Sequence, residues 1–481
     1  MTSVNPVQNT RREFLSRGTF GVGSVALACL LQQDKLLAIP KNVTLEPKTY
    51  DLTPKVPAVP PRAQAMISLF MHGGPSQMDL MDPKPELTKR DGESYDGKVV
   101  FSFFNRATSR LLGSPWKFEQ HGESGTPVSE LLPHMAGIVD DICVIRSMHT
   151  DTNDHGTSIG KLLHGGTRPQ RPALGAWLSY GLGSENQNLP AFVALPDPER
   201  HPNKGIQNWG NGWLPSIFQG TVVRSKEPRI LNLEPPPHLK GTLQRQNLDF
   251  LQELNRDYVE RNPGESDLEA RIASYELAAR MQTDAKDALD ISRETRATHE
   301  MYGLDDPVSQ EYGTRCLIAR RLIERGVRVV QLFLPFQPWD HHTGIRNNLP
   351  EVCRKTDKPS AGLVKDLKAR GLLDSTLVHW GGEFGRLPVC EGNPTNGGRD
   401  HNGQGFSLWL AGGGVRPGTT YGETCDFGHR AMVDKVSHHD FQATLLHLFG
   451  LDHDKLTFLY NGREQKLTDD QSCRVVHEIF S

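Results

Sequence analysis

Continuous apolar runs, each closed by a loop of glycine and polar residues, recur along most of this chain and constrain its fold more than any other feature. The first run, AMISLFM at 65–71, ends in HGGP. Similar runs stand at 142–145, 191–195, 327–334, 376–380 and 406–410. A strand buried on both faces of a sheet has this pattern. Helical segments at 307–325 and 360–370 precede two of the runs, which predicts an α/β fold with a mostly parallel central sheet flanked by helices.

One segment, about 242–300, departs from this alternation because it contains almost no strand-forming residues. Ser266 and Glu269 have the spacing of a capping box, and apolar residues follow at helical spacing. The segment therefore predicts a helical insertion, a pair of helices. Structural packing against the sheet domain is a better explanation for it than a lid over the sheet.

The N-terminus has the form of a twin-arginine export signal. Arg11 and Arg12 precede a mildly apolar run at 18–31, and prolines recur between 40 and 61. We interpret 1–39 as the signal segment, 40–61 as a proline-rich linker and 62–481 as the folded domain. The apolar run is too short for a spanning helix, so the mature protein should have no stable transmembrane segment. The twin-arginine machinery becomes an expected partner, and the expected location is periplasmic or extracellular.

Charge and cysteine usage narrow the classes of function. The 481 residues carry a formal net charge of only −3 and no long run of Lys or Arg, which argues against nucleic acid as the main partner. Beyond Cys29 in the signal segment, the other six of the seven cysteines are scattered without a CxxC pair, so a structural zinc knuckle is not expected. The sequence does not decide whether these six form disulfides. A small-molecule or glycan ester is the expected substrate class.

Histidine and acidic residues follow or precede the apolar runs in five separate segments. Because ligands bind at the carboxyl ends of parallel strands, these residues should meet at one edge of the sheet. Carboxylate and imidazole ligands together suit Zn²⁺, Mn²⁺ or Fe²⁺, and one or two such ions can activate water and bind an ester oxygen. The candidates are His72, His155, Thr157, Asp340, His341, His342, Glu383, Arg386, Asp400 and His401.

Several longer motifs carry a family resemblance. They are HGGPSQMDLMDPKP, ARIASYELAARMQ, the step from CLIARRLIERGVRVVQL to WDHH, GGEFGRLP, GRDHN and DFQATLLHLFGLDH. From about residue 62 to the C-terminus the chain resembles the DUF1501 family, exported proteins that are similar to the sulfatase and alkaline phosphatase superfamily. The resemblance implies an alkaline-phosphatase-like or sulfatase-like fold, but it says little about activity, because the function of that family is largely undetermined.

The resemblance also implies roles for individual residues. Asp340 and His342 match the Asp and His that follow a central strand, and Glu383 matches the second acidic ligand, with Phe384 where a His is expected. His401, beside Asp400, matches a later His ligand. His72 stands where the superfamily has a metal-binding Asp, so His72 and Asp400 would complete or orient the ligand set. His341 is an additional histidine without an assigned role.

The same resemblance places a nucleophile at the start of the helix that follows the run at 142–145. His155 or Thr157 occupies that place. No CxPxR signature exists, so a formylglycine sulfatase is not expected. Arg386 is a candidate for anion binding, with a surface salt bridge as the equal alternative. The sequence thus predicts an exported metal-dependent hydrolase of phosphate or sulfate esters, and the alternative is a catalytically silent relative that binds sulfated or phosphorylated ligands.

Overall fold

The computed structural model describes residues 50–481, except 103–106, 240, 262–265 and 394. The expected signal segment and the first part of the proline-rich stretch therefore lie outside the described residues. No helix within the described ranges is long and apolar enough to cross a membrane. The six cysteines from Cys143 to Cys473 are free thiols.

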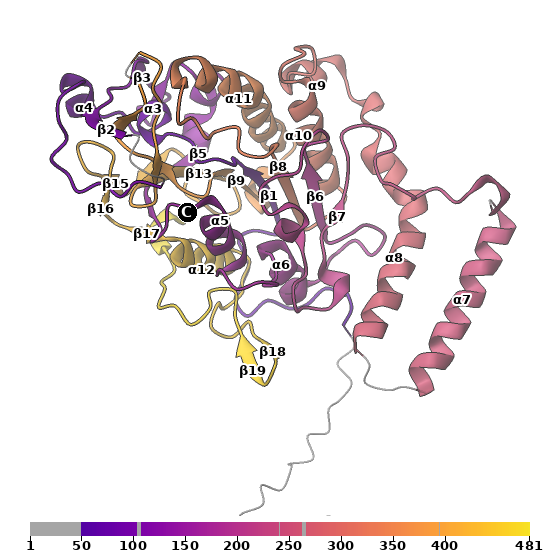
Figure 1. The fold of residues 1–481 in the computed structure, drawn as a ribbon. Helices are drawn as coiled ribbons and strands as arrows, with labels where there is room; N and C mark the ends of the chain where they lie inside the picture. Colours follow the sequence, from indigo (N-terminus) through magenta and orange to yellow (C-terminus); the bar gives the residue numbers. More distant parts are fainter. Residues whose placement is uncertain (1–49, 103–106, 240, 262–265, 394) are drawn as a thin grey trace, which may run out of the picture. The chain divides into compact units, whose positions relative to one another are not determined.

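A central sheet of nine strands organises the domain (Figure 1). The strand order is β14-β5-β13-β9-β1-β8-β6-β7, and β17 also pairs with β5. Of these strands β13 alone runs antiparallel to its neighbours. The bounds are β1 Ala65–Phe70, β5 Ile142–His149, β6 Phe192–Pro196, β7 Thr221–Val222, β8 Val329–Phe333, β9 Thr376–Gly381, β13 Phe406–Ala411, β14 Thr419–Tyr421 and β17 Val436–Ser437.

The six apolar runs all form strands of this sheet, which confirms the predicted α/β class with a mostly parallel sheet. In β1, β6, β8, β9 and β13 every residue is buried. Burial on both faces explains why these strands are continuously apolar rather than alternating. Smaller pairs lie outside the sheet: β2 Ala107–Leu111 with β11 Val389–Glu391, β3 Phe118–His121 with β4 Thr126–Ser129, β10 Gly385–Arg386 with β12 His401–Asn402, β15 Glu423–Thr424 with β16 Ala431–Val433, and β18 Phe458–Tyr460 with β19 Arg463–Gln465.

Helices cover both faces of the sheet. α10 and α11 lie together on one face, and α5, α6 and α12 lie on the other (Figure 1). The bounds are α3 Gln77–Leu80, α4 Pro85–Lys89, α5 His155–His164, α6 Leu174–Leu182, α7 Thr242–Arg261, α8 Ser266–Leu289, α9 Arg296–Met301, α10 Gln310–Ile323, α11 Ile345–Ala369 and α12 His438–Leu448. Helix α11 begins well before the predicted start at 360. Pro350 and Pro359 both lie inside it. Prolines normally interrupt a helix, so they conceal its first half from a reading of the sequence.

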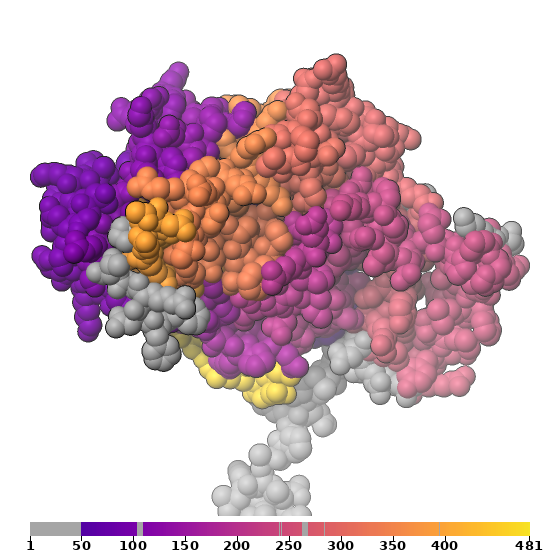
Figure 2. Space-filling view, turned by 45° about the horizontal axis from the view of Figure 1, so that its top comes forward, coloured from indigo at the N-terminus to yellow at the C-terminus, as the bar shows by residue number. Residues whose placement is uncertain are grey.

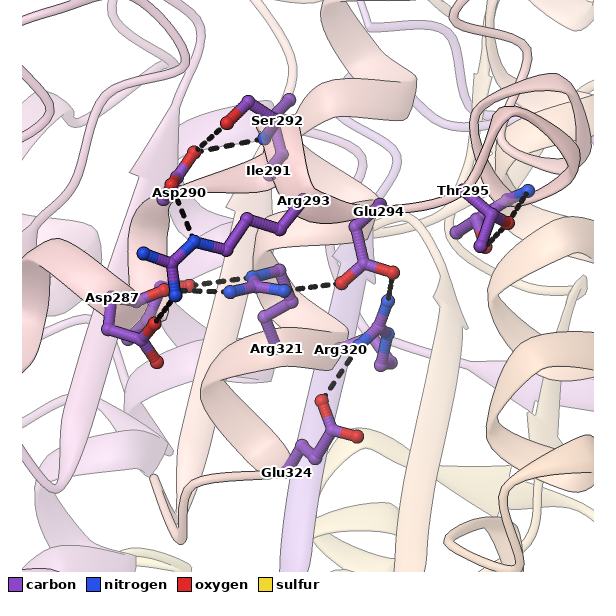
Figure 3. Close-up of polar contacts among 12 residues, drawn as sticks. Asp287, Asp290, Ile291, Ser292, Arg293, Glu294, Thr295, Arg320, Arg321 and Glu324 are labelled. Atoms are coloured by element: carbon purple, nitrogen blue, oxygen red, sulfur yellow. Dashed lines mark hydrogen bonds and ion pairs between the residues drawn. The ribbon is translucent and has the colours of Figure 1, made fainter.

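The segment expected to be helical contains α7, α8 and α9, and α8 separates α7 from the rest of the domain (Figure 1). A buried ion-pair network fastens its C-terminal end to α10 (Figure 3). Glu294 pairs with Arg320 at 2.8 Å and also with Arg321, and Arg321 Nε donates to the carbonyl oxygen of Ala288 at 3.0 Å. Because one carboxylate holds two neighbouring guanidinium groups, the end of the insertion is fixed against α10.

The described part of the proline-rich stretch, 50–61, contains no helix or strand and lies against the domain. The backbone N–H of Lys55 donates to Leu182 O at 3.0 Å, and that of Val59 donates to Gly450 O at 3.1 Å. Leu52 is buried. This part of the stretch is therefore attached to the surface of the domain.

A histidine buried in the sheet predicts how stability depends on pH. His379 in β9 is 2 % exposed and lies 3.0 Å from Ser68 Oγ through Nδ1, and burial lowers its pKa to about 3. An unfolded histidine titrates near 6.5, so below that pH the unfolded chain binds more protons than the folded one. The contribution of neutral His379 to the free energy of unfolding is therefore fully present above pH 6.5. It decreases by about 1.4 kcal/mol for each pH unit below that value, until the folded histidine itself titrates near pH 3.

The variant His379→Gln should therefore show a weaker dependence of its unfolding temperature on pH below 6.5 than the wild type does. The pH dependence, rather than the absolute temperature, is the measured quantity. His238→Gln serves as the control, because His238 is exposed. Equal pH dependence in His379→Gln and the wild type would contradict the assignment.

Candidate metal centre

Five segments that are distant in the sequence meet at the carboxyl edge of the central strands. His72 follows β1, Asp340 and His342 follow β8, and Glu383 follows β9. His155 is the first residue of α5, which begins after β5. His401 reaches the same place from β12, which pairs with β10 just after Glu383. Since β9, β1 and β8 are adjacent and parallel, their carboxyl ends deliver these side chains to one position.

Asp340 is the centre of the cluster. Its Oδ1 lies 3.0 Å from His342 Nε2 and 3.1 Å from His401 Nε2, and its Oδ2 lies 3.3 Å from His155 Nε2. The two Nε2 atoms of His342 and His401 are 3.0 Å apart. Three imidazole rings therefore direct the same ring atom at one carboxylate.

The opposite nitrogen of each ring donates to a fixed acceptor. His155 Nδ1 donates to Glu383 Oε1 at 2.6 Å, and His342 Nδ1 donates to Glu391 Oε2 at 2.5 Å. His401 Nδ1 donates to the carbonyl oxygen of Asn153 at 2.7 Å. Carboxylates and carbonyls only accept hydrogen bonds, so the Nδ1 atom of each ring carries the proton. In the neutral rings, every Nε2 then presents a lone pair.

This arrangement places lone pairs against one another. If all three histidines are neutral, their Nε2 atoms face the oxygens of Asp340 with nothing between them, so either a proton or a cation must relieve the repulsion. Nε2 of His155 is a buried atom without a hydrogen-bond partner in the described part of the chain. The charges also favour a cation. Asp340 pairs with Arg386, whereas Glu383, Glu391 and Asp400 lie against the histidines His155 and His342, so these four carboxylates outnumber the one guanidinium among them. The residues thus fit a divalent cation, whose imidazole ligands are usually held by carboxylate or carbonyl acceptors.

The pKa values of Asp340 and the three histidines reflect a competition between burial and neighbouring charges. Burial alone would raise the pKa of Asp340, but Arg386 and the three histidines hold it well below its usual range. Burial works to lower the pKa of His342, yet contacts with Asp340 and Glu391 raise it to about 9. The pKa of His155 is raised by Asp340 and Glu383 against the effect of burial, and that of His401 is lowered, mainly by burial. Without a metal, His342 therefore holds a proton that a metal ion would displace.

Arg386 fixes Asp340. Its Nη2 lies 2.6 Å from Asp340 Oδ1 and also contacts Gly73 O, and its Nε donates to Gly74 O at 2.9 Å. The residue is 1 % exposed, and Nη1 donates to Arg399 O. Every nitrogen of the guanidinium is engaged with the protein, which favours a role in holding Asp340 over the predicted binding of a substrate anion.

Two glycines of the HGGP sequence permit this close packing. Gly73 has φ +108°, and a Cβ atom there would lie 2.7 Å from Asp340 N. Gly74 has φ +78°, and a Cβ atom there would lie 2.7 Å from the Phe384 ring. The N–H of Gly73 also donates to Glu383 Oε1 at 3.0 Å. A side chain at either position would therefore push the loops of Asp340 and Glu383 apart.

The other predicted site residues lie at the margin of the cluster. His72 is fully buried between Phe70 and Phe333, its pKa is lowered to about 4 by burial, and neither ring nitrogen has a hydrogen-bond partner among the described residues. The backbone N–H of Thr157 donates to Asp154, the N-cap of α5, at 2.7 Å. Thr157 thus belongs to the first turn of the helix and is not one of the residues that contact Asp340.

Asp400 and His341 support the loops of the cluster. Asp400 Oδ1 lies 3.8 Å from His342 Nδ1, and its oxygens accept from the N–H and hydroxyl of Ser102 and from the N–H of His401. His341 is 8 % exposed, and its carbonyl oxygen accepts from the N–H of Arg399 at 2.9 Å. The backbone of His341 therefore joins the loop of Asp340 to the loop of His401.

Possible ligand groups among the described residues comprise His155 with Asp340 and His401, and His342 with Asp400 and His401. These two groups share His401 and are compatible with one ion or two. A third group, Asp452, His453 and Asp454, lies apart from the sheet edge. Its carboxylates already pair with Lys455 at 3.1 Å and with Lys466 at 2.8 Å, so its charge is compensated.

Glu391 and Asn153 are the functional residues that the sequence did not indicate. Glu391 belongs to the short strand β11, and Asn153 contributes only its backbone carbonyl. A backbone acceptor has no sequence signal. For Glu391 the only signal is its place eight residues after Glu383, in the second short strand after that predicted ligand.

The hydrogen bond from His342 to Glu391 predicts that two substitutions at Glu391 lower the metal affinity to different extents. Glu391→Gln keeps an acceptor for His342 but removes the charge, and we expect metal affinity to fall about tenfold; Glu391→Ala removes both, and we expect a decrease of about a hundredfold. Competition with a chromophoric chelator measures both affinities. Glu423→Gln, which changes an exposed carboxylate in β15, should leave the affinity unchanged. Equal affinities for Glu391→Ala and the wild type would remove Glu391 from the site.

Comparisons with solved structures return distant likenesses. A sulfatase from Pseudoalteromonas sp., PsFucS1, is 15% identical, with 73% of this chain and 70% of that chain covered and a TM-score of 0.33. The lipoteichoic acid synthase LtaP from Listeria monocytogenes is 9% identical, with 85% and 75% covered and a TM-score of 0.35. Ps i-CgsB, solved in complex with k-i-k-neocarrahexaose, is 13% identical, with 67% of each chain covered and a TM-score of 0.30. Likenesses of this size say nothing about the reaction of this chain.

A search among curated proteins finds no match. The family comparison is more informative, because one family model covers nearly the whole described domain. That family is described as "Protein of unknown function (DUF1501)", and its match spans residues 63–480. The chain therefore belongs to the DUF1501 family.

Proposed function

We propose that this protein is an exported, metal-dependent hydrolase of phosphate or sulfate esters. The observation that carries the proposal is the convergence of three Nε2 atoms on the Asp340 carboxylate while each Nδ1 is bonded to an acceptor. His342 and His401, oriented in this way and neutral, offer lone pairs to a shared cation, and His155 offers its lone pair beside them. Export rests on the twin-arginine sequence at the N-terminus.

In this proposal Asp340, His342 and His401 hold a Zn²⁺, Mn²⁺ or Fe²⁺ ion. Such an ion lowers the pKa of a bound water and polarises an ester oxygen. The side chains of Asp340 and His342 are 18% and 27% exposed, so the cluster is reached from solvent on their side. A small ester or the end of a glycan chain fits this approach better than a deeply inserted substrate does.

His155 has a different task. It contacts the other oxygen of Asp340, and Glu383, which is fully buried, fixes its ring through Nδ1. A histidine that donates through Nδ1 to a buried carboxylate is suited to accept a proton at Nε2, or to attack phosphorus or sulfur from that atom. Glu383 therefore acts on the reaction through His155 in this arrangement, whereas the resemblance implied a direct metal ligand.

The test combines metal analysis with substrate screening. Protein purified without chelators should contain a transition metal, should hydrolyse at least one aryl phosphate or aryl sulfate, and should lose that activity on chelation and regain it with the metal. Protein that contains no transition metal and whose esterase activity survives chelation would refute the proposal.

A second candidate function is ligand binding without turnover. The ring of Phe384 lies 4.8 Å from that of His155 and 4.7 Å from that of His401, so an apolar side chain occupies the space beside the predicted nucleophile. A silent protein would bind a sulfated or phosphorylated ligand and release no product. Steady product release from either aryl ester would exclude this function.

A further inference from the structure

Most of the large apolar residues of helix α7 are exposed to solvent, which is unexpected for a helix that packs only against its own domain. The side that faces α8 carries partly buried residues, most of them polar: Gln244, Leu248, Gln252, Asn255 and Val259. Gln252 Nε2 donates to Glu276 Oε1 of α8 at 2.9 Å. An ordinary surface helix buries its apolar stripe and exposes its polar one.

The exposed side of α7 holds large apolar side chains instead. Their exposed fractions are 46% for Leu243, 62% for Phe250, 43% for Leu251, 49% for Leu254 and 50% for Tyr258. Residues 243, 250, 254 and 258 are spaced by seven, four and four, which places them on one stripe. We call these five residues the α7 stripe. Scattered apolar residues on a surface need no explanation, but a continuous stripe of this kind indicates a surface that another molecule covers.

A cavity continues the stripe toward the body of the domain. It has a volume of about 610 Å³ and is lined mainly by apolar residues, among them Leu248, Leu251, Tyr275, Leu277, Ile230 and Leu231. Tyr275 and Leu231 are themselves 55% and 61% exposed. In the space-filling view the two helices, in magenta and pink, project at the side of the domain (Figure 2). The cavity gives a bulky apolar side chain of a partner a place to anchor.

An acidic row borders the stripe. Asp249, Glu253, Asp257 and Glu260 are exposed and are spaced by four, four and three, so they form a second row beside the apolar one. Asp257 pairs with Arg261 at 3.5 Å. In the part of the chain that the structure describes, Asp249, Glu253 and Glu260 have no ion-pair partner. The acidic row therefore lies between the apolar residues and the exposed arginines Arg245 and Arg256, which border the row on the side away from the stripe.

We propose that the α7 stripe is a docking site for an amphipathic helix of another protein, one whose apolar face is bordered by Lys or Arg. The apolar faces would pack together, a bulky side chain would enter the cavity, and the basic residues would pair with the acidic row. The site is independent of the metal centre.

The charges distinguish this partner from two others. In an antiparallel pairing of α7 with α7 of a second copy, equivalent edges of the two helices meet, so the acidic rows would face each other. An anionic membrane surface would also be repelled by the acidic row. A basic amphipathic helix would cover the α7 stripe with its apolar face and pair with the acidic row through its Lys or Arg residues.

Fluorescence anisotropy with the full chain and labelled peptides tests the proposal. The probe is a helical peptide of about five turns with a leucine stripe bordered by lysines. The control peptide has the same stripe bordered by glutamates. We expect the lysine peptide to bind at least about tenfold more tightly than the glutamate peptide.

Variants of exposed residues locate the binding. Phe250→Ser with Leu254→Ser should weaken binding of the lysine peptide at least about tenfold, whereas Leu459→Ser, at another exposed apolar residue, should not. Asp249→Lys, Glu253→Lys and Glu260→Lys together should reverse the preference in favour of the glutamate peptide. Unchanged unfolding temperatures show that the variants fold.

Three results would overturn the proposal. One is equal binding, or no binding, of the two peptides. Another is a dimer of the wild type that Phe250→Ser dissociates, which would assign the stripe to a second copy. The third is binding to anionic vesicles of phosphatidylserine and phosphatidylcholine that depends on Phe250, which would assign it to a membrane.

Discussion

Asp340→Asn should abolish metal binding and lower any ester hydrolysis on the order of a thousandfold. The substitution keeps the size of the side chain but removes the charge that three Nε2 atoms and Arg386 face. Its amide N–H₂ would in addition compete with the cation for the lone pairs of the histidines. Metal content and hydrolysis of aryl phosphate and aryl sulfate are the two measurements, and circular dichroism establishes that the variant is folded.

Two further variants sharpen this experiment. Asp434→Asn changes an exposed aspartate in a turn and should retain metal and activity. His155→Gln should keep the metal and lose the hydrolysis, because His155 lies on the opposite oxygen of Asp340 from His342 and His401. If His155→Gln loses the metal as well, His155 is a ligand. If Asp340→Asn retains both metal and activity, the centre is not where we place it.

The sequence predicted the sheet because its strands are unusual in one respect. β1, β8 and β9 are buried on both faces, so their apolar character is continuous and visible without any alignment. The same reasoning located Asp340, His342 and Glu383, since each follows one of these strands. Helix α11 was only half visible, because Pro350 and Pro359 obscure its helical pattern.

The roles of the site residues were harder to predict than their positions. The sequence indicates that His155 and Glu383 are near the site, but it does not show that Glu383 binds Nδ1 of His155 at 2.6 Å. A tautomer depends on distances between segments more than two hundred residues apart in the sequence. Arg386 is a similar case: its burial, and its contacts with Gly73, Gly74 and Asp340, become visible only when three loops are assembled.

Among the proposed substitutions, breaking the buried ion pair of Asp79 and Arg399 should destabilise the protein most. Arg399 Nε and Nη2 lie 2.7 and 3.0 Å from the oxygens of Asp79, and both side chains are 0% exposed. Arg399→Met would leave Asp79 buried without its partner, which should lower the free energy of unfolding by about 3 to 5 kcal/mol. Chemical denaturation measures this change. The control Arg463→Met breaks an exposed pair with Asp470 and should cost about 1 kcal/mol or less.

The double variant Asp79→Leu with Arg399→Met separates stability from function. Replacing both charges removes the unpaired group, so most of the lost free energy should return. Metal affinity should remain reduced, because Arg399 precedes Asp400 and His401, and Asp79 holds that loop against α3, which follows His72 and the HGGP turn. An apolar pair lacks the two directed hydrogen bonds that fix the loop in position. If the double variant regains both stability and metal affinity, the pair contributes packing alone; if it regains stability without affinity, Asp79 and Arg399 position His401.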